Sequence, residues 1–430
     1  MKLALGIDLG TSGIRSAIVD QDGAVLCMAR ASYGEQNPDQ ISAQIWWDGV
    51  VDCITNQINA MRELGLEPKD IICIGVDGTS GSMVLTDTNL VPVTRALMYN
   101  SSGFTAEAEA IARHAPNPHI TQGSGSALGR MMRLQSEDTD NYAKHMLHQA
   151  DFIAAKLIGQ GGLSDENNTL KTGYDPETKD WPTWAEAAGV RIDLLPKVQP
   201  AGSPITTISE TIAAQFGLAN TAMIHAGTTD SIAAFLASAP LKVGAAVTSL
   251  GTTLAIKLLS HTRIDAPDIG LYSHKLGDHW LVGGASNTGG GVLQHFFSVE
   301  KIRELSTQID PAIASDLDYY PLLKHGERFP TKNPDLAPRL SPRPASDAAF
   351  LHGMMESIAR IEAECYSAMV RLNAPYPNVI YTAGGGGSNP VWNSIRGRVM
   401  GVVFQTPDQT EAAVGTARLI TRYLKADFAF

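Results

Sequence analysis

Short apolar runs alternate with glycine-rich polar breaks through the first ninety residues of the chain. Residues 3–7 and 14–19 have the length and apolar character of buried strands, and the polar stretch 8–13 separates them. A turn at 21–23 precedes another run, up to about residue 31, that fits a third strand. The pattern therefore predicts an antiparallel meander at the start of the chain.

Helical spacing follows the meander. Apolar residues recur every three or four positions between residues 42 and 64, which predicts a helix there. Residues 71–87 fit a strand, a glycine-rich break and a second strand, and 106–159 is predicted to be mostly helical. Residues 221–238 fit a strand, a Gly-Thr-Thr-Asp turn and a helix.

One pattern occurs twice. A strand, the tetrapeptide Leu-Gly-Thr-Ser at 9–12 and a second strand are matched by a strand, Leu-Gly-Thr-Thr at 250–253 and a second strand, about 240 positions later. This separation is far too long for a solenoid, so it predicts a duplicated domain. Two such turns that face each other across a cleft can grip a polyphosphate through N–H and O–H donors. The pattern breaks near 239–244, which predicts domains at 1–239 and 240–430.

Composition narrows the classes of partner. The chain has 430 residues, 44% of them apolar, and a net charge of −11, which argues against nucleic acid. An anionic substrate therefore needs local donors or a metal ion. No signal peptide or membrane-length apolar stretch is visible, so we expect a cytoplasmic protein without a membrane partner. The four cysteines lack the spacing of a zinc site or a disulfide framework and are expected to be reduced thiols: Cys27, Cys53, Cys73 and Cys365.

Asp8 is the first candidate for chemistry. It ends the first predicted strand and precedes the small residues Gly10, Thr11 and Ser12. Such a turn exposes backbone N–H groups to an anion, and the carboxylate can hold a cation beside it. The alternative is an ordinary hairpin whose Asp caps the turn.

A glycine run near the end of the chain is the second candidate. Residues 379–401 fit a strand, four glycines at 384–387 and a helix that Ser388 or Asn389 can cap. Trp392 lies one turn into this helix, where its ring can stack on an adenine. Two alternatives remain: a dinucleotide-binding turn, because Asp408 lies about 20 residues further on, and glycines that only pack the helix on a sheet. The chain contains no P-loop motif.

Six segments together resemble the FGGY family of carbohydrate kinases, over nearly the whole chain. They are LALGIDLGTSG, HAGTTDS, TSLGTT, GGASNTGG, GERFP and GGGGSNPVWNSIRGRVMG, in that order. The resemblance implies an α/β, duplicated actin-like (ribonuclease H-like) fold of two domains that bind ATP between them. It also implies that the N-terminal domain binds the sugar and the C-terminal domain binds ATP. The sequence is most similar to those of the short D-ribulose kinases of cyanobacteria and plant plastids, some of which are called xylulose-kinase-like.

The resemblance implies roles for individual residues. Asp230 corresponds to the general base, although an Asp at this place can also simply cap the helix. Asp8 would face Mg²⁺ and a sugar hydroxyl, and Thr11 would donate to the transferred phosphoryl group. Residues expected on the sugar side are Asp77 and Ser80, for which a structural turn is an alternative. Residues expected to bind ATP are Ser12, Gly251, Thr252, Gly385, Gly386, Asn389 and Trp392.

The sequence leaves the roles of several other residues open. Trp46 or Trp47 can line the sugar pocket, although helix-face packing suits at least one of them. Three polar residues of the 164–175 loop can reach the substrate or order the loop: Asp165, Asn168 and Lys171. The Trp-Asn-Asp-x-Arg pattern of larger relatives stands here as 99–103, Tyr-Asn-Ser-Ser-Gly, which puts their sugar contacts in doubt.

These features predict a Mg²⁺- and ATP-dependent pentulose kinase that converts D-ribulose to D-ribulose 5-phosphate. D-Xylulose, another ketose or a polyol is the first alternative substrate. A nucleotide-binding regulator without turnover is a second alternative, but the chain keeps both Asp8 and Asp230. An NAD-dependent oxidoreductase is the third.

Overall fold

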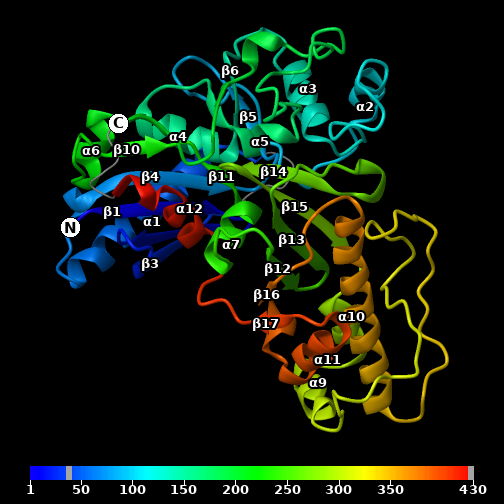
Figure 1. Cartoon of the computed structure of the whole chain (residues 1–430). Coiled ribbons are helices and arrows are strands. Elements are labelled where there is room, and N and C mark those ends of the chain that lie inside the picture. The colour runs from blue at the N-terminus through cyan, green and yellow to red at the C-terminus, as the bar shows by residue number, and fades with distance from the viewer. Residues whose placement is uncertain (35–40, 425–430) are drawn as a thin grey trace. The chain divides into compact units, whose positions relative to one another are not determined.

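The structure is a computed structural model, and it describes residues 1–34 and 41–424. The chain forms two compact units. Unit 1 comprises Met1–Ala237 and Gln409–Phe430, and unit 2 comprises Ser238–Asp408. Unit 2 is therefore inserted into unit 1. Figure 1 shows the two units with their elements labelled.

Unit 1 is built on a mixed sheet. In spatial order its strands are β3 (Val25–Ser32), β2 (Gly13–Val19), β1 (Leu3–Leu9), β4 (Ile71–Gly78), β10 (Met223–His225) and β9 (Pro204–Thr207), and the short β11 (Thr228–Thr229) also pairs with β4. The predicted meander β1–β2–β3 is confirmed as antiparallel. β4 runs parallel to β1, and β10 and β11 run parallel to β4. Every residue of β1 is buried, which explains its continuous apolar run.

Helices cover both faces of this sheet. One side carries α1 (Gln44–Glu63) and α4 (Gln149–Ile158), where Trp46 packs edge-on against Phe152. The other carries α12 (Ala412–Ile420), which packs on β1, β2 and β4. In Figure 1 this red helix lies beside the blue strands of the N-terminus. α7 (Asp230–Ser238) touches α12 so closely that a Cβ at Gly415 would lie 1.7 Å from the Ala233 carbonyl oxygen.

Smaller elements complete unit 1. β5 (Met83–Thr86) pairs with β6 (His145–His148), so the predicted mostly helical region 106–159 contains a strand as well. β7 (Leu163–Asp165) pairs with β8 (Lys197–Gln199). The remaining helices are α2 (Thr105–Ala112), α3 (Ala127–Glu137), α5 (Glu166–Leu170), α6 (Glu210–Phe216) and the 3₁₀ turns η1 (Pro68–Asp70), η2 (Ile192–Leu194) and η5 (Thr421–Leu424).

Unit 2 repeats the plan of unit 1. Its sheet has the order β14 (Tyr272–Leu276), β15 (His279–Ser286), β13 (Leu254–Ser260), β12 (Ala245–Leu250), β16 (Val379–Ala383) and β17 (Val403–Gln405). β12 pairs antiparallel with β13 and parallel with β16, as β1 does with β2 and β4. The remaining elements are α8 (Gly290–Phe296), α9 (Val299–Ser306), α10 (Asp347–Arg371), α11 (Pro390–Met400), η3 (Pro267–Ile269) and η4 (Gly385–Ser388).

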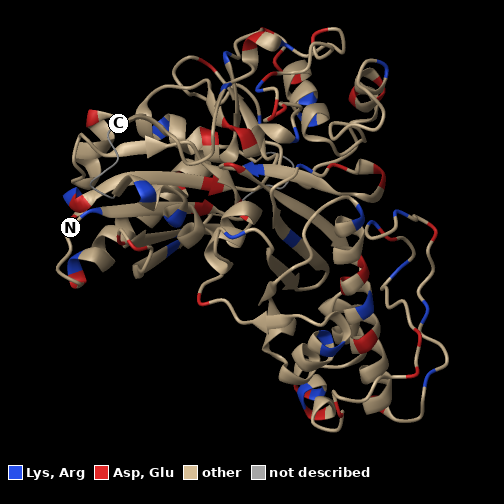
Figure 2. Cartoon of the chain, viewed as in Figure 1, with Lys and Arg blue, Asp and Glu red and all other residues tan. Residues whose placement is uncertain are grey.

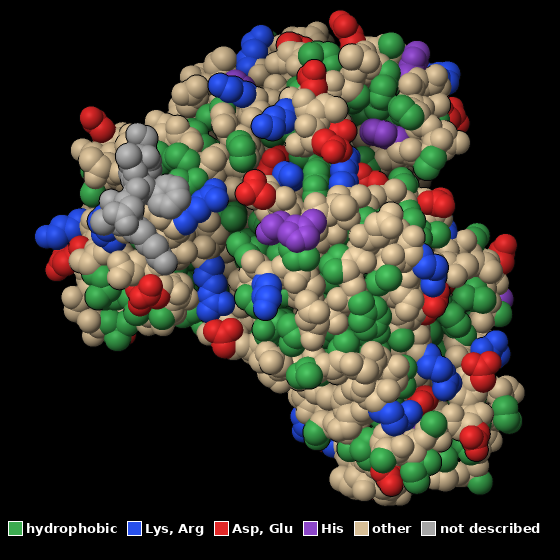
Figure 3. All heavy atoms as spheres, viewed as in Figure 1, with side chains coloured by type: hydrophobic (Ala, Val, Ile, Leu, Met, Phe, Trp, Pro, Cys, Tyr) green, Lys and Arg blue, Asp and Glu red, His purple; other side chains and the backbone are tan. Residues whose placement is uncertain are grey.

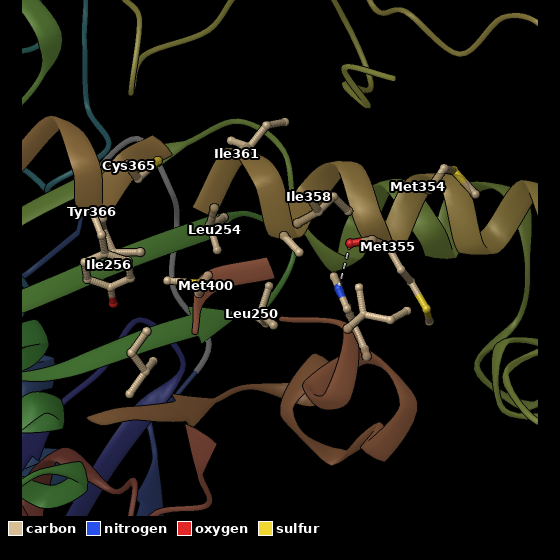
Figure 4. Packing of buried hydrophobic residues seen from close by; sticks show 14 of the residues in the cluster. Leu250, Leu254, Ile256, Met354, Met355, Ile358, Ile361, Cys365, Tyr366 and Met400 are labelled. Carbon is tan, nitrogen blue, oxygen red and sulfur yellow. Dashed lines mark hydrogen bonds between the residues drawn. The ribbon is translucent and has the colours of Figure 1, made fainter. Parts of the chain in front are cut away.

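The core of unit 2 lies between its sheet and α10. Figure 4 shows side chains of β12 and β13, among them Leu250, Leu254 and Ile256, near Met355 and Ile358 of α10. The repeated strand–turn–strand pattern places Gly10–Ser12 and Gly251–Thr253 at equivalent positions, each after the first strand of its unit. The predicted duplicated α/β fold is thus confirmed.

The compact units differ from the predicted domains in the C-terminal segment. The chain leaves unit 1 after Ala237, close to the predicted end of the first domain at 239, but it returns at Gln409. The predicted second domain, 240–430, therefore includes a segment that belongs to unit 1. The reason is the apolar face of α12, where Ala413, Val414 and Ala417 are buried against Ala4 and Cys73 of the first sheet.

Candidate active site

Two carboxyl groups meet at the ends of β1 and β4. The parallel register pairs Asp8 with Asp77, so both side chains lie on one face of the sheet. Asp8 is 4% exposed and Asp77 is 0% exposed. Figure 2 shows several red ribbon segments, which mark acidic residues, near the ends of these central strands. Arg15, opposite Asp8 on β2, places Nη1 3.5 Å from Asp8 Oδ2 and Nε 3.2 Å from a carboxylate oxygen of Glu411.

Burial changes the acidity of both groups. It raises the pKa of Asp8 above 3.8, and the charge of Asp230 raises it further, while hydrogen bonding to Asp77 and the charge of Arg15 oppose the rise. The pKa of Asp77 is raised well above 3.8 by burial and by the charge of Asp8, although the Thr416 hydroxyl, which donates to its Oδ2, partly offsets this. Burial therefore favours the protonated form of both groups, and most strongly that of the fully buried Asp77.

Asp230 joins these two groups from a third strand. β11 runs parallel to β4, with Thr228 opposite Asp77, and α7 begins at Asp230. Asp230 is half-buried, and its Oδ1 accepts the Ser231 backbone N–H at 2.6 Å. Because Asp8 and Thr228 are both paired with Asp77 in the parallel register, the end of β11 brings Asp230 close to the other two carboxyl groups within unit 1. Its charge raises the pKa values of both.

Hydrogen bonds from polar side chains of α5 hold β11 in place. Asn167 Nδ2 donates to Thr228 Oγ1 at 3.0 Å, and Asn168 Nδ2 donates to the Thr228 carbonyl at 3.0 Å and to Asp165 Oδ2 at 2.6 Å. Asp165 also accepts the Asn167 and Asn168 backbone N–H groups as the cap of α5. Its pKa is raised to about 6 by burial and by the charge of Asp151. Asp165 and Asn168 thus order the segment that leads to Asp230.

The loop after β4 directly follows the strand that carries Asp77. Ser80 Oγ is buried, and within the described part of the chain it has no hydrogen-bond partner. Gln149 Oε1 accepts from the Thr79 backbone N–H at 3.0 Å and from its hydroxyl at 2.7 Å. The buried Arg130 guanidinium donates to four backbone carbonyls, those of Gly81, Tyr99, Ser101 and Gly125. Burial lowers the pKa of Arg130 to about 10.

Unit 2 contains a cavity of about 390 Å³. Its wall combines apolar side chains with the two glycine turns of this unit: Leu250, Gly251, Thr252, Gly290, Leu293, Gln294, Val299, Ile302, Arg303, Ser306, Thr307, Gly385, Gly386, Ser388, Asn389, Pro390, Val391 and Trp392. A mostly apolar cavity with a few polar groups is typical of a site for a small organic ligand.

The glycine turn after β16 is shaped by contact with β12. Gly384 has a φ of +82°, and a Cβ there would lie 2.8 Å from the Leu250 carbonyl oxygen. A Cβ at Gly385 would meet nothing within 4 Å, so this residue leaves space at the cavity wall. Asn389 caps α11 by accepting the Trp392 backbone N–H at 3.1 Å, and its Nδ2 donates to Ser306 Oγ at 2.9 Å.

Two family models together match most of the chain. The N-terminal domain of the FGGY family of carbohydrate kinases matches residues 3–237, and the C-terminal domain of that family matches 246–422. The chain belongs to the FGGY family of carbohydrate kinases. It is thus an ATP-dependent sugar phosphotransferase.

Named relatives cover almost the full length of this FGGY kinase. It is 24% identical to the xylulose kinase of Bacillus subtilis, over 97% of this chain and 88% of the relative. It is 22% identical to the xylulose kinase of Escherichia coli, over 96% and 89%. Among solved structures, the xylulose kinase from Rhodospirillum rubrum has a TM-score of 0.85 at 17% identity, over 100% of this chain and 91% of that one. The glycerol kinase of Plasmodium falciparum, solved with ADP, has a TM-score of 0.83 at 13% identity, over 100% and 91%.

Several predicted residues of the FGGY kinase lie elsewhere than the sequence suggested. Asp77 is fully buried, so its carboxyl group acts on Asp8 and offers no surface to a sugar. Trp392 is 2% exposed, and its indole N–H donates to the Met355 carbonyl at 3.1 Å, so the predicted ring-on-adenine stack is not supported. It contributes part of the cavity wall instead. Figure 4 shows a hydrogen bond at the Met355 carbonyl as a dashed line.

The remaining predicted residues occupy different environments in the structure. Thr11 and Ser12 have exposed side chains in a turn closed by the Gly10 N–H and the Gly13 carbonyl at 3.0 Å. Thr252 is exposed, and Gly251 lines the cavity. Of the two tryptophans on α1, Trp46 is core and 1% exposed, and Trp47 is half-buried with Lys156 Nζ 5.9 Å from its ring centre. Lys171, which the sequence left open, directly follows α5.

Sequence reasoning missed Thr416, Arg130 and Gln149. Thr416 is remote from Asp77 in the chain, and Arg130 lies on a helix whose pattern suggests only packing.

No described helix is long and apolar enough to cross a membrane. Acidic and basic side chains are interspersed on the face seen in Figure 3.

Proposed function

We propose that this FGGY kinase phosphorylates a ketopentose, most specifically D-ribulose to D-ribulose 5-phosphate. The observation that carries the proposal is the cluster of Asp8, Asp77 and Asp230 in unit 1. Two of these carboxyl groups are buried and have raised pKa values, while the third heads a helix beside them. Acid–base sites typically contain neighbouring carboxyl groups whose pKa values differ because their surroundings differ.

Asp230 is the general base in this proposal. Its carboxylate accepts the proton of the sugar hydroxyl as that oxygen forms a bond to the γ-phosphorus of ATP, and the bond from phosphorus to the β,γ-bridging oxygen breaks. The products are the sugar phosphate, ADP and a proton on Asp230, which then passes to solvent. Asn167, Asn168 and Thr228 fix the backbone that presents Asp230. Ser80, with its unpartnered buried hydroxyl, is the second group assigned to the sugar.

The cavity of unit 2 takes the nucleotide. Its apolar wall suits a base, and the turns that contain Gly251, Thr252, Gly385 and Gly386 suit phosphates because their backbone is accessible there. Thr11 and Ser12 are exposed hydroxyls in the equivalent turn of unit 1, and we assign them to the phosphoryl group that is transferred. Asn389 holds the start of α11 beside the cavity.

Asp8 is the residue that would hold Mg²⁺. The described residues contain no group of three or more His, Cys, Asp or Glu side chains that could hold a metal ion. One carboxylate plus phosphate oxygens is the usual manner of Mg²⁺ binding in kinases, so the residues fit the ion. The chemistry that Mg²⁺ would supply at Asp8 is neutralisation of phosphate charge in the transition state. The buried Asp77 and Thr416 orient Asp8 for this task.

D-Xylulose is the second candidate because relatives that cover almost the whole chain are named xylulose kinases. ADP release by the purified protein, measured with Mg-ATP and a panel of D-ribulose, D-xylulose, L-ribulose, gluconate and glycerol, distinguishes the two. We expect the highest kcat/KM with D-ribulose. A higher kcat/KM with D-xylulose would overturn the D-ribulose assignment, and no sugar-dependent release with any of the five would overturn the kinase proposal for ketopentoses.

A further inference from the structure

A fully buried ion pair joins the two longest helices of unit 2. Glu362 lies on α10 and Arg396 on α11, and both side chains are 0% exposed. Arg396 donates from Nε and Nη2 to the two carboxylate oxygens of Glu362, each at 2.6 Å. The pair is therefore bidentate and out of contact with water.

The pair also bonds the two central strands of the sheet. Thr248 Oγ1 on β12 donates to Glu362 Oε1 at 2.6 Å, and Arg396 Nη1 donates to Thr382 Oγ1 on β16 at 2.8 Å. These two threonines face each other in the parallel register of the strands. Each precedes a cavity-lining turn by a few residues, so the ion pair is tied to the strand ends from which both turns emerge.

A third connection reaches the glycine turn itself. Arg396 Nη1 donates to Asn393 Oδ1 at 3.0 Å, and Asn393 Nδ2 donates to the Gly387 carbonyl at 2.8 Å. A Cβ at Gly387 would lie 2.9 Å from Thr382 Cγ2, so the turn rests directly on a partner of Arg396. Any shift of the guanidinium would therefore move both the strand end and the turn.

Unit 1 shows that the fold does not require this polar group. The positions equivalent to Thr248 and Thr382, one residue before Asp8 and Asp77 in the same register, are Ile7 and Val76. Both are apolar and buried in the core. Buried ion pairs often add little to stability over apolar residues of similar size, so a purely structural need explains the pair poorly.

We propose that Glu362 and Arg396 are positioning residues for the nucleotide, because they fix the turn at 384–387 relative to the end of β12. This inference rests on the proposed assignment of the cavity to ATP. Neither residue lines the cavity, so neither contacts the ligand. Their effect on the reaction passes through Asn393, Thr382 and Thr248.

The double variant Glu362→Leu/Arg396→Met tests the proposal without leaving one charge buried alone. We expect the Kd and KM for ATP to rise by about tenfold or more, since small displacements of positioned groups have large effects, while the KM for the sugar changes by less than about twofold. Arg396→Lys keeps the charge but loses the planar fork, so we expect an intermediate rise in the Kd for ATP. This single variant replaces the double variant if the latter does not fold.

Glu356→Leu/Arg398→Met is the matched control. This pair joins the same two helices, with Arg398 Nη1 3.1 Å from Glu356 Oε1, and neither residue lines the cavity. We expect a similar loss in melting temperature and an unchanged Kd for ATP. A folded Glu362/Arg396 variant with the wild-type Kd for ATP, or a control with the same rise, would overturn the positioning role. Absence of ATP binding by the wild type would instead refute the assignment of the cavity.

Discussion

Asp230 carries the reaction proposed here more directly than any other side chain. Asp230→Asn keeps the shape of the residue but cannot accept the sugar proton. We expect kcat for sugar phosphorylation to fall by about 10²–10⁴-fold, as is usual for loss of a general base. The Kd for ATP should stay close to wild type, because the cavity lies in unit 2. ADP release and isothermal titration with ATP measure the two effects.

Asp87→Asn is the control for the backbone role of Asp230. Asp87 Oδ1 accepts the backbone N–H groups of Asn89 and Val91 in an exposed turn, much as Asp230 accepts that of Ser231. This variant should lose a little stability and keep full activity. If Asp230→Asn behaves in the same way, Asp230 is only a cap and the base lies elsewhere.

The raised pKa of Asp77 gives a prediction about stability. Its folded pKa is raised well above the value of 3.8 by burial and by the charge of Asp8, whereas the unfolded chain ionises Asp77 near 3.8. The stabilising contribution of protonated Asp77 is therefore complete below the unfolded pKa and is lost as the pH rises toward the folded pKa. Asn mimics the protonated acid, so Asp77→Asn should gain stability relative to wild type as the pH rises from 4 to 8.

Urea unfolding of both proteins at intervals across that range measures the difference. Asp193→Asn is the control of opposite sign, because hydrogen bonding to Arg191 lowers the pKa of Asp193. That variant should become less stable than wild type as the pH rises through the acidic range. If Asp77→Asn follows the sign of Asp193→Asn, the raised pKa of Asp77 in the folded protein is refuted.

At the scale of elements, the two glycine–threonine turns differ in chemistry although they share a shape. Asp8 stands two residues before Gly10, whereas Ser249 stands two residues before Gly251. The carboxylates therefore gather in unit 1 alone, and the equivalent turn of unit 2 borders the cavity. The duplicated fold thus supports a division of labour between sugar chemistry and nucleotide binding.

Gly384 offers a test of the turn that borders the cavity. Ala at a φ of +82° costs about 1–2 kcal/mol in backbone strain, and its Cβ would also lie 2.8 Å from the Leu250 carbonyl. Gly401→Ala is the control, because Gly401 has a φ of +68° and no neighbour within 4 Å of the added Cβ. We expect both variants to lose stability in thermal melts, but only Gly384→Ala to weaken ATP binding. Equal ATP affinities in the two variants would contradict the role of this turn.

Local signals explain which elements the sequence could predict. The hairpin around Gly10 and the turn at 384–387 were predictable because glycines and short apolar runs specify turns and strands within a few residues. The partnership of Thr416 with Asp77 was not, because it joins positions 339 apart. The apolar pattern of α12 predicts a helix but does not say which sheet the helix covers. For the same reason the pair Glu362–Arg396, 34 positions apart on two helices, escaped prediction.

At the scale of the whole molecule, the chain passes through all of unit 2 before it supplies the last segment of unit 1. α12 returns to cover β1, β2 and β4, and it brings Thr416 to the acidic cluster. The sequence predicted two similar halves in succession, and the structure instead has one unit inserted in the other. A segment near the C-terminus therefore belongs to the proposed sugar site, where the sequence had placed it with ATP.

The proposed division of ligands between the units predicts which amides each ligand protects. A ligand stabilises the structure that it binds, by about 2.7 kcal/mol at one hundred times its Kd, and thereby slows hydrogen exchange there. Mg-ADP without sugar should slow exchange in peptides that cover 250–254 and 384–392 of unit 2. D-Ribulose without nucleotide should slow it in peptides that cover 77–82 and 226–231 of unit 1. Mass spectrometry of exchange measures both patterns, and peptides from β14 and β15 serve as the unaffected control. Protection of unit 1 by Mg-ADP in place of unit 2, or of unit 2 by D-ribulose in place of unit 1, would reverse the assignment. Because the two ligands are added separately, a wrong sugar would leave the nucleotide pattern intact. The assignment of the nucleotide to unit 2 and that of the sugar to unit 1 are therefore tested by separate measurements.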